Sequence, residues 1–244
     1  MQTIIIRYML NIYRSQILIF FFLVSTATFT SAQKGSFNYD NKFSKKNYYF
    51  GITLGSNISR YRCDNHVSLV NNDSVNSIRP IFGPGFNLGI VANIKLGEYF
   101  DCRFLLPTLS FADRRIEYDM TTNQIDNKKI ESVFLEFSVH FRYKSKPYKD
   151  VRLFVVAGAK YSLDLASNSR SRKADDLIKV AMHDVVAEFG FGFQVFFPYF
   201  ILSPEVKFSY GLMDIHSRDE GLIYSSVVDK LFSRGFSISL HFEG

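Results

Sequence analysis

Apolar and polar side chains alternate with a period of two along most of this chain, and this pattern constrains its fold more than any other feature. In the segment 132–143 the odd-numbered residues are all apolar or aromatic, whereas the even-numbered ones include Glu136, His140 and Arg142. Successive residues of a β-strand point to opposite faces, so the pattern predicts strands with one apolar and one mixed face. Eight segments carry it: 48–55, 86–94, 100–116, 132–143, 151–162, 184–197, 200–212 and 235–242.

The alternation is disturbed in two places. In 100–116 the apolar phase shifts near Leu106, which predicts a β-bulge there. Pro204 stands on the apolar face of 200–212, and nothing in the sequence explains why an inner strand tolerates a residue that has no N–H to donate.

The lengths of the strands and of their connections predict a membrane protein. Most of the eight segments reach the about 9 to 11 residues that a membrane-spanning strand needs. Short turns at one end, long loops at the other and an aromatic belt are typical of bacterial outer-membrane barrels. The short connections are 95–98, 144–150 and 197–199, with Tyr48, Tyr99, Tyr143, Tyr148 and Tyr199 beside them; the long ones are 58–82, 113–128, 164–183 and 213–231. The prediction is an all-β fold, an eight-stranded antiparallel transmembrane up-and-down β-barrel that contacts membrane lipid in the bacterial outer membrane.

A soluble barrel of the lipocalin type is the alternative, with its apolar face turned inward around a ligand. The apolar face here carries large side chains and no charge, whereas the other face mixes glycine and serine with charged residues. The interior of an eight-stranded barrel is just wide enough for side chains, and small residues with paired charges fit it better. We therefore expect Phe191 to meet lipid, and Gly190 and Gly192 to face the lumen.

The first 32 residues have the order of a secretory signal peptide. Arg7 and Arg14 precede an apolar run at 17–24, and Thr30-Ser31-Ala32 closes the segment. A run of eight is too short to cross a bilayer as a helix, although an uncleaved anchor is the alternative. The expected organisation is a cleaved signal peptide at 1–32, an exposed periplasmic linker at 33–47 and the barrel at 48–244.

The mixed face predicts an ion-pair network inside the barrel, because charges in a poorly solvated lumen need partners. Its expected role is to stabilise the barrel, and a proton or substrate path is the alternative. The expected members are Arg103, Arg114, Glu136, Arg142, Arg152, Lys160, Glu188, Glu205 and Lys207.

Catalytic and metal-binding patterns are weak. Glu136, Ser138 and His140 share a strand face, but neighbours on one face lie about 7 Å apart, beyond the reach of a nucleophile and its base. His66, His183 and His216 stand singly in predicted loops, without the spacing of metal ligands. Hence no catalytic, cofactor-binding or metal-binding residue is assigned, and no cofactor is expected.

Positive charge gathers at the end with the short turns. The linker 33–47 holds four lysines and one aspartate, and the turn 144–150 holds Lys144, Lys146 and Lys149 with one aspartate. The basic end is expected to be either a solvated rim beside anionic headgroups or a docking face for a partner. Cys63 and Cys102 are predicted at opposite ends of the barrel and therefore unbridged.

Six stretches carry a resemblance to a known family: 50–55, 84–90, 103–111, 136–145, 168–170 and 203–207. In their order and spacing they resemble the PorT family of Bacteroidetes outer-membrane proteins, and the resemblance runs from Tyr48 to the C-terminus. The end, 235–242, also resembles the signal that the barrel-assembly machinery reads, except that Glu243 and Gly244 follow the last phenylalanine.

The resemblance implies a non-enzymatic component of the type IX protein secretion system, which exports cargo and supports gliding in some relatives. Its partners would be other components of that system at the periplasmic face, and nucleic acid is not expected as a partner. The main alternative is a general structural or adhesion-type small barrel, and a hydrolase at the edge of the lumen is a third.

Overall fold

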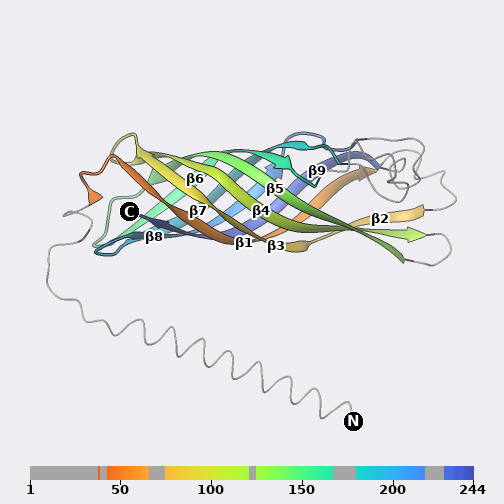
Figure 1. The fold of residues 1–244 in the computed structure, drawn as a ribbon, viewed down its shortest axis with the longest axis horizontal. Coiled ribbons are helices and arrows are strands. Elements are labelled where there is room, and N and C mark those ends of the chain that lie inside the picture. Colours follow the sequence, from red (N-terminus) through yellow and green to blue (C-terminus); the bar gives the residue numbers. More distant parts are fainter. Residues whose placement is uncertain (1–37, 39–42, 66–74, 121–124, 167–179, 218–227) are drawn as a thin grey trace, which may run out of the picture. The chain divides into compact units, whose positions relative to one another are not determined.

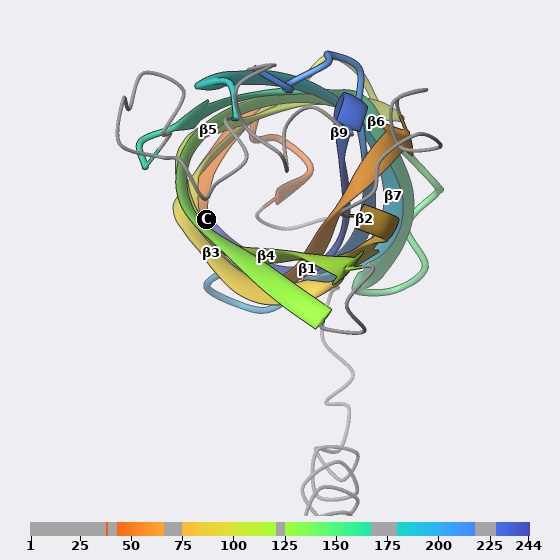
Figure 2. The ribbon, with the colours of Figure 1, turned by 90° about the vertical axis from the view of Figure 1, so that its right-hand side faces the viewer.

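The computed structural model describes residues 38, 43–65, 75–120, 125–166, 180–217 and 228–244, and these form one closed antiparallel β-barrel (Figures 1 and 2). The strands are β1 (Tyr48–Asn65), β2 (Val75–Ile81), β3 (Gly83–Lys95), β4 (Phe100–Met120), β5 (Ile125–Lys144), β6 (Val151–Asp164), β7 (His183–Phe196), β8 (Ile201–Gly211) and β9 (Val228–Glu243). Each strand pairs with the next along the barrel wall, and β1 closes the ring against β9. β2 pairs with the extracellular part of β4, and β3 pairs with the rest of that strand. The two short strands therefore share one place in the wall, and the predicted eight-stranded barrel is confirmed.

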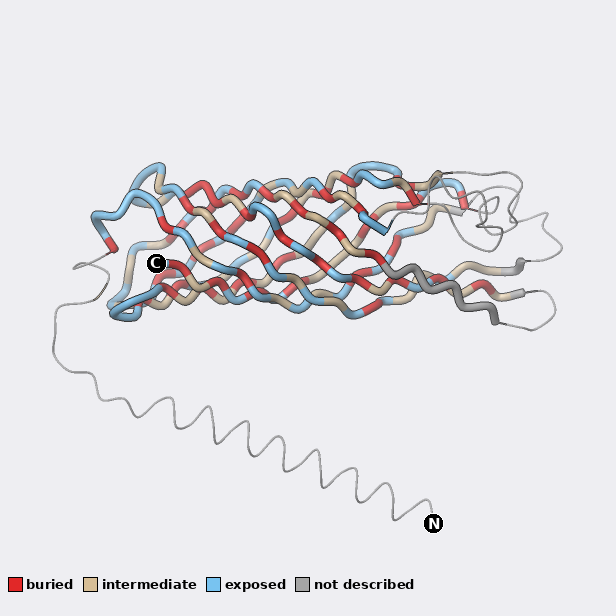
Figure 3. The backbone as a smooth tube through the Cα atoms, in the orientation of Figure 1, coloured by how far each residue is buried: buried red, intermediate tan, exposed pale blue. Residues whose placement is uncertain are grey.

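The alternating faces lie as the sequence predicts. Figure 3 shows buried and exposed residues alternating along the strands. On β7, Phe191 is 57% exposed on the outer face, whereas Glu188 and Gln194 are buried inside. An outer face of large apolar side chains matches a lipid surrounding rather than water, so the soluble alternative is not supported.

Both disturbances of the pattern have a backbone explanation. The register of β4 shifts by one residue between Leu105 and Thr108, which is the predicted bulge. Beside Pro204, the pairing of β7 with β8 is interrupted between Gly192↔Glu205 and Val195↔Leu202. The pairing of β8 with β9 continues through Pro204↔Leu240. The proline therefore lies where the ladder to β7 is open, and its missing N–H leaves the ladder to β9 intact.

Two of the predicted long loops are instead largely strand. β1 continues to Asn65 and β2 begins at Val75, inside the predicted loop 58–82; β4 and β5 cover most of the predicted loop 113–128. Polar composition suggested loops there, but antiparallel pairing satisfies the backbone in water as well as in lipid. Ile116 and Tyr118 keep the inward phase of β4 and are fully buried. At this end the strands therefore extend beyond the rest of the barrel wall, as Figure 1 shows for β2 and β4.

The outer apolar band has the height of a membrane. On β1 the exposed apolar residues run from Tyr48 to Ile58, and Arg60 and Arg62 follow. About ten residue steps of ~3.3 Å, tilted by ~40°, give a height of roughly 25 Å, the thickness of the apolar band of outer-membrane barrels. Exposed tyrosines, including Tyr48, Tyr148 and Tyr199, mark the end with the short turns, which is the periplasmic end.

The predicted signal peptide, 1–32, lies outside the described residues, as does most of the predicted linker. The described part of that linker differs from the expectation, because Phe43 is only 2% exposed and packs into the barrel end rather than standing in solvent. No helix in the described part of the chain is both long enough and apolar enough to cross a bilayer.

Candidate functional site

Buried aromatic and aliphatic side chains form a plug at the periplasmic end of the lumen. Phe43 packs against Tyr49, Phe196 and Ile201, which are all buried. The Tyr49 hydroxyl donates to the carbonyl of Phe43 at 3.0 Å, and Lys95 Nζ donates to the same carbonyl. The start of the described chain is thus held in the barrel mouth by both packing and hydrogen bonds.

Above this plug lies a layer centred on Asp101. Arg142 donates to Asp101 at 2.9 Å, and Lys144 pairs with its other oxygen at 2.5 Å. Asn93 donates to the same carboxylate at 3.1 Å and accepts from Arg142 at 2.7 Å. All four polar groups are buried, so each charge is matched by a partner within hydrogen-bonding distance.

The next layers are centred on two buried glutamates. Glu205 accepts from Arg103 at 2.8 Å and lies near Lys207 and His241, at 3.6 and 3.5 Å. Glu188 faces Lys160 at 3.1 Å and Lys207 at 3.6 Å. Glu188 also accepts from Ser209 at 2.9 Å, and His140 Nε2 lies 2.8 Å from it. Lys207 therefore joins the two centres into one network across the barrel.

The predicted network is found, with additions and two exceptions. Among its nine predicted members, Arg103, Arg142, Lys160, Lys207, Glu136, Glu188 and Glu205 form ion pairs inside the lumen. Arg114 instead donates to Ser59 and Ser233, and Arg152 to the carbonyls of Ser145 and Glu98. Members missed from the sequence are Asp101, Asn93, Lys144, His241 and Glu243. Glu243, which follows the last phenylalanine, pairs with Arg103 and Arg142.

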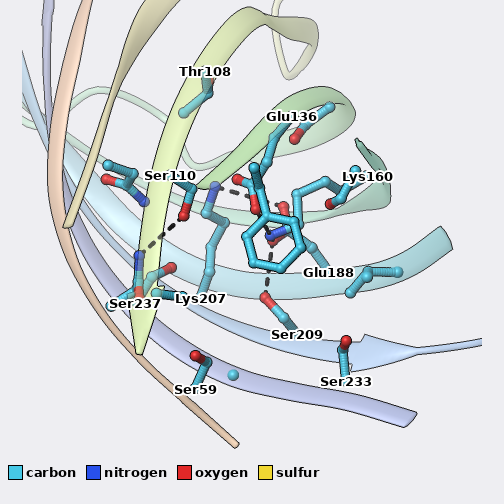
Figure 4. Close-up of a pocket in the computed structure, with 18 of the residues that line it drawn as sticks. Ser59, Thr108, Ser110, Glu136, Lys160, Glu188, Lys207, Ser209, Ser233 and Ser237 are labelled. Carbon is cyan, nitrogen blue, oxygen red and sulfur yellow. Dashed lines mark hydrogen bonds and ion pairs between the residues drawn. The ribbon is translucent and has the colours of Figure 1, made fainter. Parts of the chain in front are cut away.

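A small polar cavity of about 60 Å³ lies between this network and the extracellular end. Figure 4 shows Lys160, Glu188, Lys207 and Ser209 converging on it, with Thr108, Ser110 and Ser237 around them. Within the described residues, the side-chain oxygens of Asn57, Asn87 and Thr108 that line it have no hydrogen-bond partner. Its size suits a few water molecules and is far below the about 300 Å³ of the smallest ligand pockets.

An apolar cluster of buried side chains lies at the extracellular end of the lumen. It comprises Tyr61, Ile116, Tyr118, Val180, Ile215, Val228 and Leu231, all buried. Below it, the guanidinium of Arg114 lies 4.8 Å from the ring centroids of both Tyr61 and Phe134. The cluster joins the extended ends of β1, β4 and β9 to the segments at Val180 and Ile215, so it braces the extracellular strands.

The residues considered for catalysis and metal binding lie apart. His140 is fully buried and bonded to Glu188, and among the described residues no serine hydroxyl hydrogen-bonds to its ring. His183 Nδ1 lies 2.7 Å from the Tyr161 hydroxyl, and His66 lies outside the described residues. Within the described ranges, no group of three or more metal-ligating side chains is assembled.

The basic periplasmic end needs one correction. Lys144 is not an exposed turn residue: it is buried on β5 and paired with Asp101. Lys45, Lys46, Lys146 and Lys149 are exposed. Cys63 and Cys102 are both free in the structure. Cys63 lies beyond the apolar band, where burial raises the pKa of its thiol to about 12.

Comparison with known proteins gives a family and several structures of similar architecture. A family model described as an outer membrane protein beta-barrel domain matches residues 31–217. Ail, the attachment invasion locus protein of Yersinia pestis, is 14% identical over 82% of this chain and 100% of its own, with a TM-score of 0.36. OprG from Pseudomonas aeruginosa is 11% identical over 80% of this chain and 93% of its own, with a TM-score of 0.44. Neisserial surface protein A is 11% identical over 80% of this chain and 96% of its own, with a TM-score of 0.41. No curated protein sequence matches the chain.

Proposed function

The chain belongs to the outer membrane protein beta-barrel domain family, and from that premise we propose that it is a closed, non-enzymatic barrel that serves the outer membrane as a structural or adhesion-type protein. The observation that carries the proposal is that buried side chains fill the lumen at both ends. Buried plugs lie at Phe43 and at the Tyr61 cluster, with an ion-pair network between them. We infer that a barrel filled in this way has no open path through it and acts through its outer wall and its two ends.

The extracellular strand extension is the surface best suited to such a role. β2 pairs with β4 from Ile81↔Arg115 to Val75↔Met120, beyond the apolar band. Its outer face presents Arg79 beside Glu117, with Arg115 exposed next to them. On the inner face of this extension, Ile116 and Tyr118 of β4 pack into the apolar cluster. A braced, charged sheet that projects from the membrane gives other molecules a stable surface to bind.

The test separates the two roles. A strain without the gene is complemented with the wild type or with a variant in which Arg79, Arg115 and Glu117 are replaced by alanine. If the barrel is an adhesin, only the wild type restores attachment of cells to surfaces or to one another. If it is structural, both restore resistance of the outer membrane to detergents. A deletion strain with normal attachment and normal detergent resistance would reject the proposal.

A second candidate is a role in type IX protein secretion. It is supported by the resemblance to the PorT family and by the exposed Lys45, Lys46, Lys146 and Lys149 at the periplasmic end. Deleting the gene should then leave unprocessed cargo in the periplasm. Replacing Lys146 and Lys149 with glutamate should block export without preventing insertion, because exposed charges contribute little to stability. Lys144 must be left intact, since glutamate there would face Asp101. Normal export in the deletion strain would reject this candidate.

A further inference from the structure

Two arginines lie side by side on the outer wall, just beyond the extracellular edge of the apolar band. Arg60 on β1 is directly opposite Arg234 on β9 in the antiparallel register. On the other side of Arg234, Tyr210 of β8 is its partner in the antiparallel register. Phe82 comes directly after the end of β2. Like charges directly opposite each other destabilise a sheet. The pair therefore calls for an explanation other than the stability of the wall.

Each guanidinium is held by an aromatic ring on its far side. Arg60 stacks on Phe82 at 4.5 Å from the ring centroid, and Arg234 stacks on Tyr210 at 4.2 Å. Stacking uses the flat face of a guanidinium and leaves the N–H donors along its edge available. In the part of the chain that the structure describes, Arg62 pairs with Asp64 at 3.3 Å, whereas neither Arg60 nor Arg234 has an ion-pair partner.

A groove of about 710 Å³ connects this pair to the apolar wall, lined among others by Arg60, Arg234, Phe82, Phe208, Tyr210 and Phe236. One step toward the membrane from the arginines, Phe208 is opposite Phe236 and Phe236 is close to Ile58, which is exposed. The rings of Phe208 and Phe236 lie 5.3 Å apart. Two cationic heads thus stand at headgroup depth above an aromatic surface at acyl-chain depth.

We propose that this groove binds a phosphorylated lipid of the outer leaflet, with its phosphate between Arg60 and Arg234 and an acyl chain along Phe208, Phe236 and Ile58. Arginine binds phosphate through paired N–H donors, and two arginines match its charge. An anion between them would also remove the repulsion of the like-charged pair. The apolar residues below distinguish a lipid from free phosphate, which has no part to place there.

The test uses the full-length barrel purified in detergent, with phosphorylated lipid A as the probe and native mass spectrometry as the readout. The wild type should retain one lipid per barrel. The variant R60A/R234A should bind it roughly a hundredfold more weakly, about tenfold for each lost charge-assisted contact. The matched control K230A removes an exposed cation on the same strand as Arg234 but outside the groove, and should bind within about twofold of the wild type.

Two further measurements identify the ligand chemistry. Dephosphorylated lipid A should bind the wild type as weakly as phosphorylated lipid binds R60A/R234A, and millimolar inorganic phosphate should not displace the lipid. Heat-modifiable migration on a gel verifies that each variant is folded. Equal binding by R60A/R234A and the wild type, or equal binding of the two lipids, would overturn the proposal. Displacement by inorganic phosphate would show a simple anion site and overturn it as well.

Discussion

Replacing Phe191 with arginine tests which face of the wall meets lipid. Phe191 is 57% exposed on the outer face of β7. The register row through it crosses the membrane from Tyr143, near the periplasmic edge, through Val155, Phe191, Val206 and Ile238 to Ser56, near the extracellular edge. Because strands are tilted by about 40°, each step along such a row changes depth by roughly 3 Å. Phe191 therefore lies close to the bilayer midplane.

At that depth an arginine on the lipid face costs about 2 to 4 kcal/mol, whereas near an interface it costs about 0 to 1 kcal/mol. Val185 supplies the matched control, since it lies on the same strand and face, six residues toward the extracellular end. Six steps of ~3.3 Å, tilted by ~40°, place it roughly 15 Å above Phe191, beyond the edge of a ~25 Å band. Phe191→Leu should change stability little, because it keeps an apolar side chain in lipid.

The assay is denaturant unfolding of the barrel in lipid vesicles, followed by circular dichroism and by heat-modifiable gel migration. Phe191→Arg should lower the free energy of unfolding by about 2 to 4 kcal/mol, and Val185→Arg by much less. Equal effects at the two positions, or none at Phe191, would refute the assigned depth and facing. Gly192→Ala is not a clean probe of the lumen, because a Cβ there would lie 2.3 Å from the carbonyl oxygen of Pro204.

Two further predictions concern the lumen and the extracellular cap. Glu205→Gln leaves Arg103 and Lys207 underpaired in the interior and should destabilise the barrel by about 3 to 5 kcal/mol. The control Arg62→Ala breaks an exposed ion pair and should cost at most about 1 kcal/mol. Equal unfolding midpoints for the two variants would refute the stabilising role of the network. In a Cys102→Ser background, maleimide should label Cys63 slowly at pH 7.5, because burial raises the pKa of its thiol to about 12. The labelling rate should rise about tenfold for each pH unit above 7.5, as the thiolate fraction rises. Rapid labelling at pH 7.5 would contradict the burial of Cys63.

The faces of the strands could be predicted from the sequence because the alternation is a local property of the chain. It assigned Phe191 to lipid and Glu188 to the lumen correctly. The same alternation places Lys144 on the face of Arg142, and Glu243 on the face of Ser239 and His241. Continuing the period to the strand ends would have added both to the network, so here the rule was applied too narrowly.

The strand extensions and the pairing partners could not be predicted in this way. Residues 113–119 are rich in charge, and charge predicts a loop unless a neighbouring strand is known to pair with it. The pairing of Arg79 with Glu117 and the burial of Ile116 depend on residues distant in sequence. Likewise, His140 meets Glu188 and Arg60 meets Arg234 only through the register of the closed barrel.

The central claim is that the lumen is closed and that the protein works from its ends and outer wall. The most direct test is the ion and dye permeability of lipid vesicles containing the folded barrel, with insertion verified by heat-modifiable gel migration. The account predicts that such vesicles release trapped dye no faster than protein-free vesicles, and that planar bilayers show no steady single-channel current. A steady, voltage-independent conductance would show an open path through the lumen and contradict the account.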